Sequence, residues 1–276
     1  KTWDILKPYK CFILHKYHEI KNSSFLLNQI KLAKTQTMND DDRCYYFVLF
    51  WIDNPTYSDA QKKDIKTLND ILNINTKNHL FIIDYQNTGE TFPNFYNFME
   101  NNRQYDWLQK KTFPWNMADI PELVWYNNMK SYITDETDFI WTLEYDVGWK
   151  GNLPKLYKSL ITESNLNECS LIAYDCIQHN DKWPHHFKHT SNYIYSDKEP
   201  YACLIQMLRY HPKLLQLGIN EINDNKYIYC ESRAASICKR NNKWCKICDM
   251  YRPRNKFYGV FYSGTNFLDD AWYKIL

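Results

Sequence analysis

The chain has 276 residues, of which 44% are hydrophobic and 17% aromatic. This composition excludes a disordered or fibrous protein and predicts a globular one with a sizeable core. Lys plus Arg number 34 and Asp plus Glu number 32, and no long basic run carries interleaved aromatic residues. Nucleic acid is therefore not expected as a partner.

Cysteine usage and hydropathy indicate the compartment. The nine cysteines are scattered along a large chain, which favours reduced thiols over a disulfide framework. Cys230, Cys238, Cys245 and Cys248 could hold a zinc ion, but their spacing lacks the paired knuckles of common zinc sites, so ordinary thiols are preferred. No apolar stretch approaches the roughly 18 residues of a membrane span, and the first residues lack a signal-peptide core. We therefore expect a soluble, cytoplasmic protein without a transmembrane segment.

The predicted elements of the first third alternate between strands and helices. Beginning with a strand, they are expected at residues 10–18, 23–36, 44–53, 58–72 and 78–85. Ser23 or Ser24 would cap the first helix and Ser58 the second. This alternation is typical of βαβ units. The predicted fold class is therefore α/β, with a Rossmann-type central sheet that is mixed but mainly parallel and is flanked by helices.

The later elements are less regular. Residues 86–118 predict a long, partly ordered connection, and a helix follows at 119–133, with Asp119 as its cap and Pro121 in its first turn. Beyond it we expect a strand at 138–149, a helix at 152–161, a strand at 169–177, a polar loop at 179–193, a helix at 203–218 interrupted near Pro212, and a helix at 232–241. No internal repeat or Gly/Ser-rich linker divides the chain, so a single domain, 1–276, is predicted.

The segment DFIWTLEYDVGW, residues 138–149, places two carboxylates in an apolar strand. Because strand side chains alternate between faces, Glu144 and Asp146 should share one face, with Cα atoms about 6.6 Å apart. Two like charges so close repel each other, and a bound divalent ion would make the arrangement favourable. The alternative is a frayed strand end whose carboxylates face water. Ligand crevices in open α/β sheets form at the C-terminal ends of strands, which favours the ion.

An apolar strand that ends in acid-x-acid after a series of βα units resembles the metal-binding motif of GT-A glycosyltransferases, and Glu144-Tyr145-Asp146 resembles its Glu-x-Asp version. The resemblance implies a GT-A-like fold in which Asp146 is the principal ligand of Mn²⁺ or Mg²⁺. Glu144 would contact the metal, a water molecule or the donor ribose. The resemblance also implies a nucleotide-sugar donor, expected to be a UDP-sugar, with residues 8–150 as the donor half and 151–276 as the acceptor half.

Inverting sugar transfer needs a base, which this family supplies as an acid near the start of a later helix, and Glu231 fits that place. The helix dipole keeps a carboxylate ionised there, although an acid in a first turn often only complements the dipole. Asp175, at the end of a predicted strand, could contact acceptor hydroxyls, act as an alternative base or cap the next loop. Trp183 and His185 in that loop suit a sugar-binding surface, since aromatic faces cover the apolar side of a pyranose.

Polar residues near the ends of the first strands would contact the donor on the same resemblance. His15, Tyr17, Asp53 and Asp84 would contact the base and ribose. Asn116 and Asp119 would contact the sugar. Each of these six residues also fits an ordinary loop position or a helix cap. The six glycines form neither a GxGxxG nor a Walker A pattern, which argues against kinases and dinucleotide oxidoreductases.

The expected function is therefore metal-dependent transfer of a sugar from a nucleotide-sugar to a hydroxyl of a glycan acceptor, with inversion and with Glu231 as base. A retaining transferase, a glycoside hydrolase and a non-catalytic glycan-binding protein remain open alternatives. A hydrolase would place its two carboxylates on opposite sides of the scissile bond, unlike a pair on one strand face. The abundance of Asn, Lys and Tyr suggests a microbial or large-virus source, such as an algal-virus xylosyltransferase.

Overall fold

A seven-stranded sheet forms the centre of the molecule. The computed structural model describes residues 11–20, 23–38, 44–72, 79–102, 116–133, 139–163, 168–178, 201–250, 257–258 and 271–274. The strands of the central sheet are β1 (Cys11–Tyr17), β2 (Cys44–Trp51), β3 (Leu80–Ile83), β4 (Phe139–Glu144), β6 (Leu171–Gln178), β7 (Tyr201–Tyr210) and β8 (Ile247–Asp249). Their order is β3-β2-β1-β4-β7-β6-β8.

The direction of the strands confirms the predicted fold class. Strands β3, β2, β1 and β4 are mutually parallel, β7 is antiparallel to β4 and β6, and β8 is parallel to β6. The sheet is therefore mixed but mainly parallel. From β1 the chain builds outward through β2 and β3 on one side and later returns to place β4 on the other. The sheet order thus reverses between β1 and β4, which is where open α/β sheets bind ligands.

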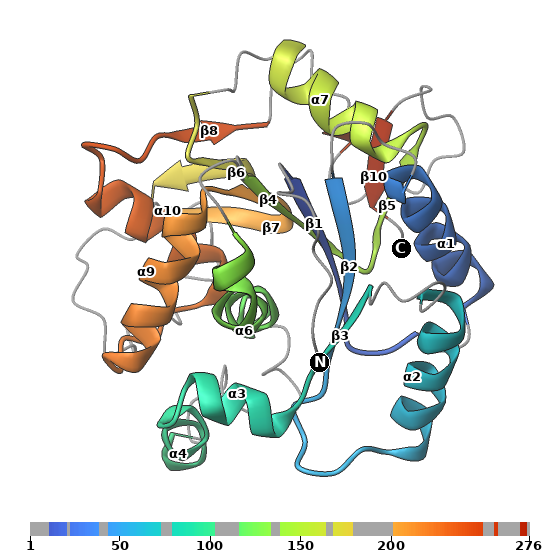
Figure 1. Cartoon of the computed structure of the whole chain (residues 1–276). Coiled ribbons are helices and arrows are strands. Elements are labelled where there is room, and N and C mark those ends of the chain that lie inside the picture. Colours follow the sequence, from blue (N-terminus) through green and yellow to red (C-terminus); the bar gives the residue numbers. More distant parts are fainter. Residues whose placement is uncertain are drawn as a thin grey trace.

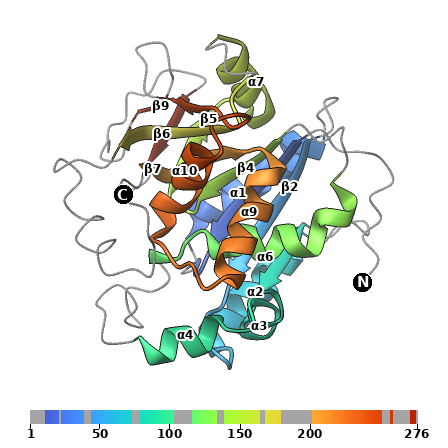
Figure 2. The same cartoon turned by 90° about the vertical axis from the view of Figure 1, so that its left-hand side faces the viewer.

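Helices cover both faces of this sheet. Their bounds are α1 (Ser24–Met38), α2 (Asp59–Leu72), α3 (Tyr85–Thr91), α4 (Phe95–Asn101), α6 (Ile120–Met129), the 3₁₀-helix η2 (Lys130–Tyr132), α7 (Leu153–Glu163), α9 (Pro212–Asn223) and α10 (Cys230–Arg240). Figure 1 shows α6, α9 and α10 on one face and α1, α2 and α7 on the other. Figure 2 shows α9 and α6 in front of the sheet after a quarter turn.

The two faces bury separate hydrophobic clusters. Alternate residues of β1 divide between them: Phe12 and Leu14 face the α6 side, whereas Ile13 and Tyr17 face the α1 side. Strands that are buried on both faces have nearly continuous apolar sequences, and β2 has such a sequence. The polar residues at the ends of such strands are therefore the ones to test for function.

A second, smaller sheet begins directly after the acidic motif. It contains β5 (Val147–Lys150), β10 (Ala271–Lys274) and β9 (Phe257–Tyr258), in that order, and β10 is antiparallel to β5. The prediction of one strand at 138–149 is therefore wrong. Strand β4 ends at Glu144, Tyr145 and Asp146 form a turn, and the chain then leaves the central sheet.

The partly ordered connection predicted at 86–118 carries most of α3 and the whole of α4. One further prediction about elements was wrong. The interrupted helix predicted at 203–218 is strand β7 followed by α9, with Pro212 as the first residue of that helix. Proline is favoured in the first turn because that residue needs no amide hydrogen there. The predicted caps are confirmed, since Ser23 Oγ and Ser58 Oγ accept hydrogen bonds from Leu26 N and Gln61 N.

Four cysteines form disulfides, which corrects the prediction of reduced thiols. Cys169 pairs with Cys248, and Cys238 pairs with Cys245. The proposed zinc set is therefore not available, because three of its four members are in disulfides. Disulfides persist mainly in oxidising compartments, so the expected cytoplasmic location loses its main support. No helix within the described residues combines the length and the apolar character needed to cross a membrane.

Candidate active site

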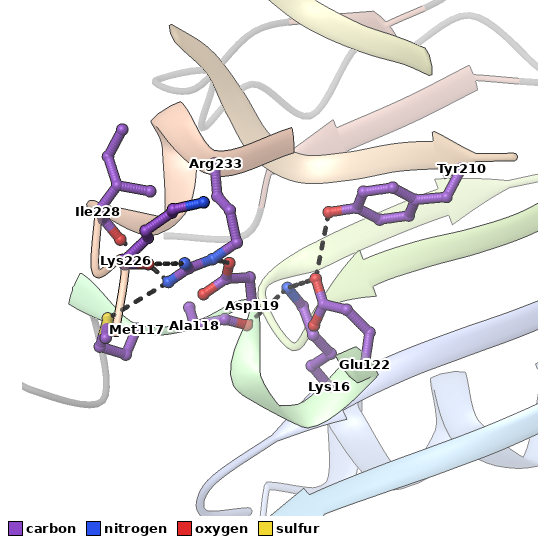
Figure 3. A network of polar contacts seen from close by, with 9 residues as sticks. All are labelled: Lys16, Met117, Ala118, Asp119, Glu122, Tyr210, Lys226, Ile228 and Arg233. Atoms are coloured by element: carbon purple, nitrogen blue, oxygen red, sulfur yellow. Dashed lines mark hydrogen bonds and ion pairs between the residues drawn. The ribbon is translucent and has the colours of Figure 1, made fainter. Parts of the chain in front are cut away.

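Charged residues gather where β1 and β4 end side by side. Lys16 on β1 is the register partner of Glu144 on β4. By strand alternation both side chains lie on the α6 face of the sheet, the face of Leu14 and Ile140. This position is the reversal point of the sheet order, and the first turns of α6 and α10 meet it from the same side (Figure 3).

Lys16 is a buried cation with carboxylates around it. Its Nζ donates to Ala118 O at 2.9 Å and to Glu122 Oε1 at 3.3 Å (Figure 3). Burial lowers the pKa of Lys16, but the negative charges of Glu122 and then Glu144 outweigh burial and raise the pKa overall. Glu144 therefore lies within electrostatic reach of a fixed positive charge, and the ammonium remains charged.

Glu122 was not identified from the sequence. It is fully buried in α6, and its Oε1 accepts hydrogen bonds from Lys16 and from Tyr210 OH at 3.3 Å. Burial raises the pKa of Glu122 to about 7, against the opposing effect of Lys16. The signal that could have revealed it is an acid inside the apolar run IPELVW, because buried acids need partners.

Asp119 and Arg233 form a second buried ion pair in the same region. Arg233 Nε donates to Asp119 Oδ2 at 2.5 Å, and the guanidinium also donates to the carbonyls of Ile228 and Lys226 (Figure 3). Asp119 holds the N-cap position of α6 as predicted, but its side chain makes no capping hydrogen bond. Its Oδ1 is buried and has no hydrogen-bond partner. The pair fixes the start of α10 against the start of α6.

Glu231 lies in the first turn of α10, since the helix begins at Cys230, two residues earlier than predicted. The residue is only 6% exposed. The N-terminal end of a helix favours the charged form of a carboxylate placed there. Glu231 also lies near Cys203 of β7, where the hydrogen bond to Cys176, then burial, and then the negative charge of Glu231 raise the pKa of the Cys203 thiol.

The acidic motif has a different geometry from the one predicted. Glu144 is the last residue of β4, and Asp146 lies in the turn before β5, so the two carboxylates do not occupy one continuous strand face. Both side chains are partly exposed, and one oxygen of Asp146 is buried. Tyr145, which lies between them, is 36% exposed. Its ring packs edge to face against the ring of His18, with the ring centroids 5.0 Å apart.

The donor set at this turn suits a hard divalent cation. Carboxylate oxygens are the ligands that Mg²⁺ and Mn²⁺ prefer, and Mg²⁺ commonly takes one or two carboxylates together with substrate phosphates and water. Glu144 and Asp146 could supply those two carboxylates. Within the described ranges, no group of three or more His, Cys, Asp or Glu side chains is arranged to hold a metal by itself.

His15 and Tyr17 do not follow β1 as predicted but lie inside it, on the face opposite to Lys16. Both are buried. The His15 ring hydrogen-bonds Tyr46 OH at 2.8 Å and Tyr17 OH at 3.1 Å. Burial lowers the pKa of His15 to about 3, although a hydrogen bond to the main chain of Glu144 partly opposes this. These residues support the end of β4 from the core.

The other predicted donor residues lie close to their expected places. Asp53 follows β2. Asp84 follows β3 and caps α3, where it also accepts a hydrogen bond from Tyr57 OH at 2.8 Å. Asn116 is buried shortly before α6. The capping role of Asp84 takes up much of its hydrogen-bonding capacity.

The predicted acceptor residues are only partly placed. Asp175 lies inside β6, which continues to Gln178, so the strand does not end there as predicted. Its side chain, and the whole of Trp183 and His185, lie outside the described residues.

No protein-family model matches the sequence, and the comparison with curated proteins finds no match. Among solved structures, apo xyloside xylosyltransferase 1 from mouse is 10% identical, with 96% of this chain and 97% of that chain covered and a TM-score of 0.41. An active-site mutant of LgtC is 13% identical, with 96% of this chain and 86% of that chain covered and a TM-score of 0.45. The 4-diphosphocytidyl-2C-methyl-D-erythritol synthase of Anaerococcus prevotii is 8% identical, with 88% of this chain and 87% of that chain covered and a TM-score of 0.42. Likenesses at this level leave the chemistry to be argued from the residues of this chain.

Proposed function

We propose that the chain is a metal-dependent glycosyltransferase that moves a sugar from a nucleotide-sugar to a hydroxyl of a glycan acceptor. The observation that carries this proposal is the placement of the two motif acids. Glu144 and Asp146 lie at the end of β4, beside β1, where the order of the central sheet reverses. This is the expected place for a nucleotide and its phosphates in an open α/β sheet.

In this proposal Asp146 is the principal ligand of Mn²⁺ or Mg²⁺, and Glu144 is a second ligand or a contact of the donor ribose. When bound, the cation supplies positive charge that stabilises the departing diphosphate. The motif residues orient the donor's diphosphate at the turn. Lys16, which faces Glu144, adds a permanent positive charge close by.

Glu231 is the proposed base of an inverting reaction. Its carboxylate would accept the proton of the acceptor hydroxyl, and its place in the first turn of α10 favours the ionised form that this role requires. Asp53, Asp84, Asn116 and Asp119 are proposed donor contacts, with Asp119 limited by its ion pair with Arg233. Asp175, Trp183 and His185 are proposed for the acceptor. Residues 8–150 would then form the donor half and 151–276 the acceptor half.

Donor binding tests the metal site first. Thermal unfolding is measured with UDP, GDP and CMP, each with and without Mn²⁺. We expect a stabilisation with UDP that requires Mn²⁺, of about 2.7 kcal/mol at a ligand concentration one hundred times the dissociation constant. Asp146→Asn should abolish this effect. Asp70→Asn is the matched control, because Asp70 forms an exposed pair on α2 far along the chain from the motif. If UDP with Mn²⁺ stabilised the Asp146→Asn variant as much as the unmodified chain, the proposed metal site at Asp146 would be wrong.

Turnover tests the reaction. Nucleotide-sugars, including UDP-xylose, UDP-glucose and UDP-galactose, are screened for metal-dependent hydrolysis and transfer. Glu231→Gln should still bind UDP with Mn²⁺ but lose about 10²–10⁴-fold in turnover, the usual contribution of a general base. The anomeric configuration of the product, read by nuclear magnetic resonance, separates inversion from retention. A retained configuration would reduce Glu231 to a binding residue.

A further inference from the structure

We infer that Cys176 and Cys203 are a modification site at which a third disulfide closes between β6 and β7. Both are free thiols in this structure, Cys203 buried and Cys176 partly exposed. They lie on two antiparallel strands that are hydrogen-bonded neighbours in the central sheet. The inference concerns the thiols themselves and does not depend on the proposed function.

The strand register places the two cysteines opposite each other. Ile177 pairs with Ala202 and Gln178 with Tyr201. Tyr174 pairs with Leu204, so Asp175 and Cys176 together lie across from Cys203, at the irregularity where the pairing shifts. Directly opposed residues of antiparallel strands have Cα atoms about 4.5–5.5 Å apart. This spacing falls within the range of about 4.4–6.8 Å that disulfides adopt.

The side chains of the pair also meet. Both pack into the hydrophobic cluster on the α6 side of the sheet, so they share one face of the strand pair. The Cys176 side chain is hydrogen-bonded to Cys203, and this contact together with burial raises the pKa of Cys203. Two thiols on the same face of neighbouring strands, within hydrogen-bonding reach of each other, are placed to form a bond.

The oxidation requires a disulfide reagent such as oxidised glutathione. The thiolate of the more exposed Cys176 attacks one glutathione sulfur and releases the other as reduced glutathione. The Cys203 thiol, after loss of its proton, then attacks the Cys176 sulfur and displaces the second glutathione. In total two protein thiols lose two electrons and two protons, one protein disulfide forms, and one oxidised glutathione becomes two reduced ones.

The surroundings of the pair explain why it matters. The two existing disulfides lie in the same part of the fold, where Cys248 of β8 is joined to Cys169 before β6 and Cys238 of α10 to Cys245. Helix α10 packs on β7, where Ser236 Oγ accepts a hydrogen bond from Tyr201 N and donates one to Tyr201 O. A bond at Cys203 would therefore stiffen the strands beneath the first turn of α10, close to Glu231.

Peptide mapping of the full chain tests the inference. The protein is equilibrated in glutathione buffers from reducing to oxidising, quenched with acid, labelled with maleimide after denaturation, and digested. We expect labelling of Cys176 and Cys203 to fall together from complete to near zero, with a cross-linked peptide that contains both. The inference would be overturned if maleimide labelled both Cys176 and Cys203 in every buffer in which the two existing disulfides stay closed.

Variants identify the partner. Cys176→Ser should return Cys203 to full labelling under oxidising conditions, whereas Cys11→Ser should leave the cross-linked peptide unchanged, because Cys11 faces Cys44 on the other side of the sheet. A Cys203–Cys230 peptide, or glutathione retained on Cys176, would contradict the assignment. The mapping of the unmodified sequence decides the question even if a variant fails to fold.

Discussion

Replacing Arg233 by methionine removes the cation of a buried ion pair while keeping most of the side-chain volume. The side chains of Arg233 and Asp119 are only 2% and 6% exposed. After the substitution, the Asp119 carboxylate stays buried without its partner, and its Oδ1 already has no hydrogen bond. Breaking a buried pair in this way typically costs about 3–5 kcal/mol. We expect a loss of that size in the free energy of unfolding.

Urea denaturation at pH 7, followed by circular dichroism, measures the effect. Lys66→Met is the matched control, because Lys66 and Asp70 form a pair whose side chains are 80% and 68% exposed, and its loss should cost under about 1 kcal/mol. The double variant Arg233→Met, Asp119→Asn should recover part of the stability, since the unpaired charge is gone.

The reasoning is refuted if Arg233→Met costs no more than Lys66→Met. It is also refuted if Asp119→Asn makes the Arg233 variant less stable still. Either result would mean that the buried charge of Asp119 carries no penalty without Arg233, contrary to its burial in the structure.

Two further predictions concern pH and the disulfides. Because burial raises the pKa of Glu122 from 4.5 to about 7, the unfolded chain releases this proton at lower pH than the folded one. Stability from this group is therefore complete below about pH 4.5 and is lost as the pH rises to about 7, by up to about 1.4 kcal/mol per unit. Glu122→Gln should flatten the pH profile of unfolding in that window, and a profile parallel to that of the unmodified chain would contradict this. Cys169→Ser opens a disulfide with a sequence separation of 79 and Cys238→Ser one with a separation of 7. Loop entropy predicts that the free energy of unfolding falls by about 4.5 kcal/mol in Cys169→Ser and by about 2.5 kcal/mol in Cys238→Ser. Equal urea midpoints for the two variants would rule out that account.

Much of the α/β architecture is encoded in local sequence patterns. The strands and helices up to Ile83 follow hydrophobic periodicity and serine caps, so they could be predicted without the structure. Strand β7 could not, because its residues are buried on both faces and such a run looks like a buried helix. The proline at 212 marks the first turn of the next helix, whereas the sequence alone equally allows a break within one helix.

The site was predicted only where local position determined it. Glu144 and Asp146 lie at a strand end as expected, but sequence cannot show that β4 ends at Glu144 and that the chain then enters another sheet. Lys16 and Glu122 are 106 residues apart, and Arg233 and Asp119 are 114 apart. Such pairs are formed by tertiary packing, which no local pattern reports. The pairing of the cysteines is equally undetermined by sequence.

Strand β10 has a consequence for how the molecule is made. It pairs with β5, which directly follows Asp146, although the two strands are far apart in the sequence. A chain that emerges from the ribosome can build β1, β2 and β3 early, but it cannot flank the acidic turn with a complete second sheet until residue 274 has appeared. A stalled or truncated product that lacks this strand would leave β5 without its partner in the second sheet, where another chain could pair with it.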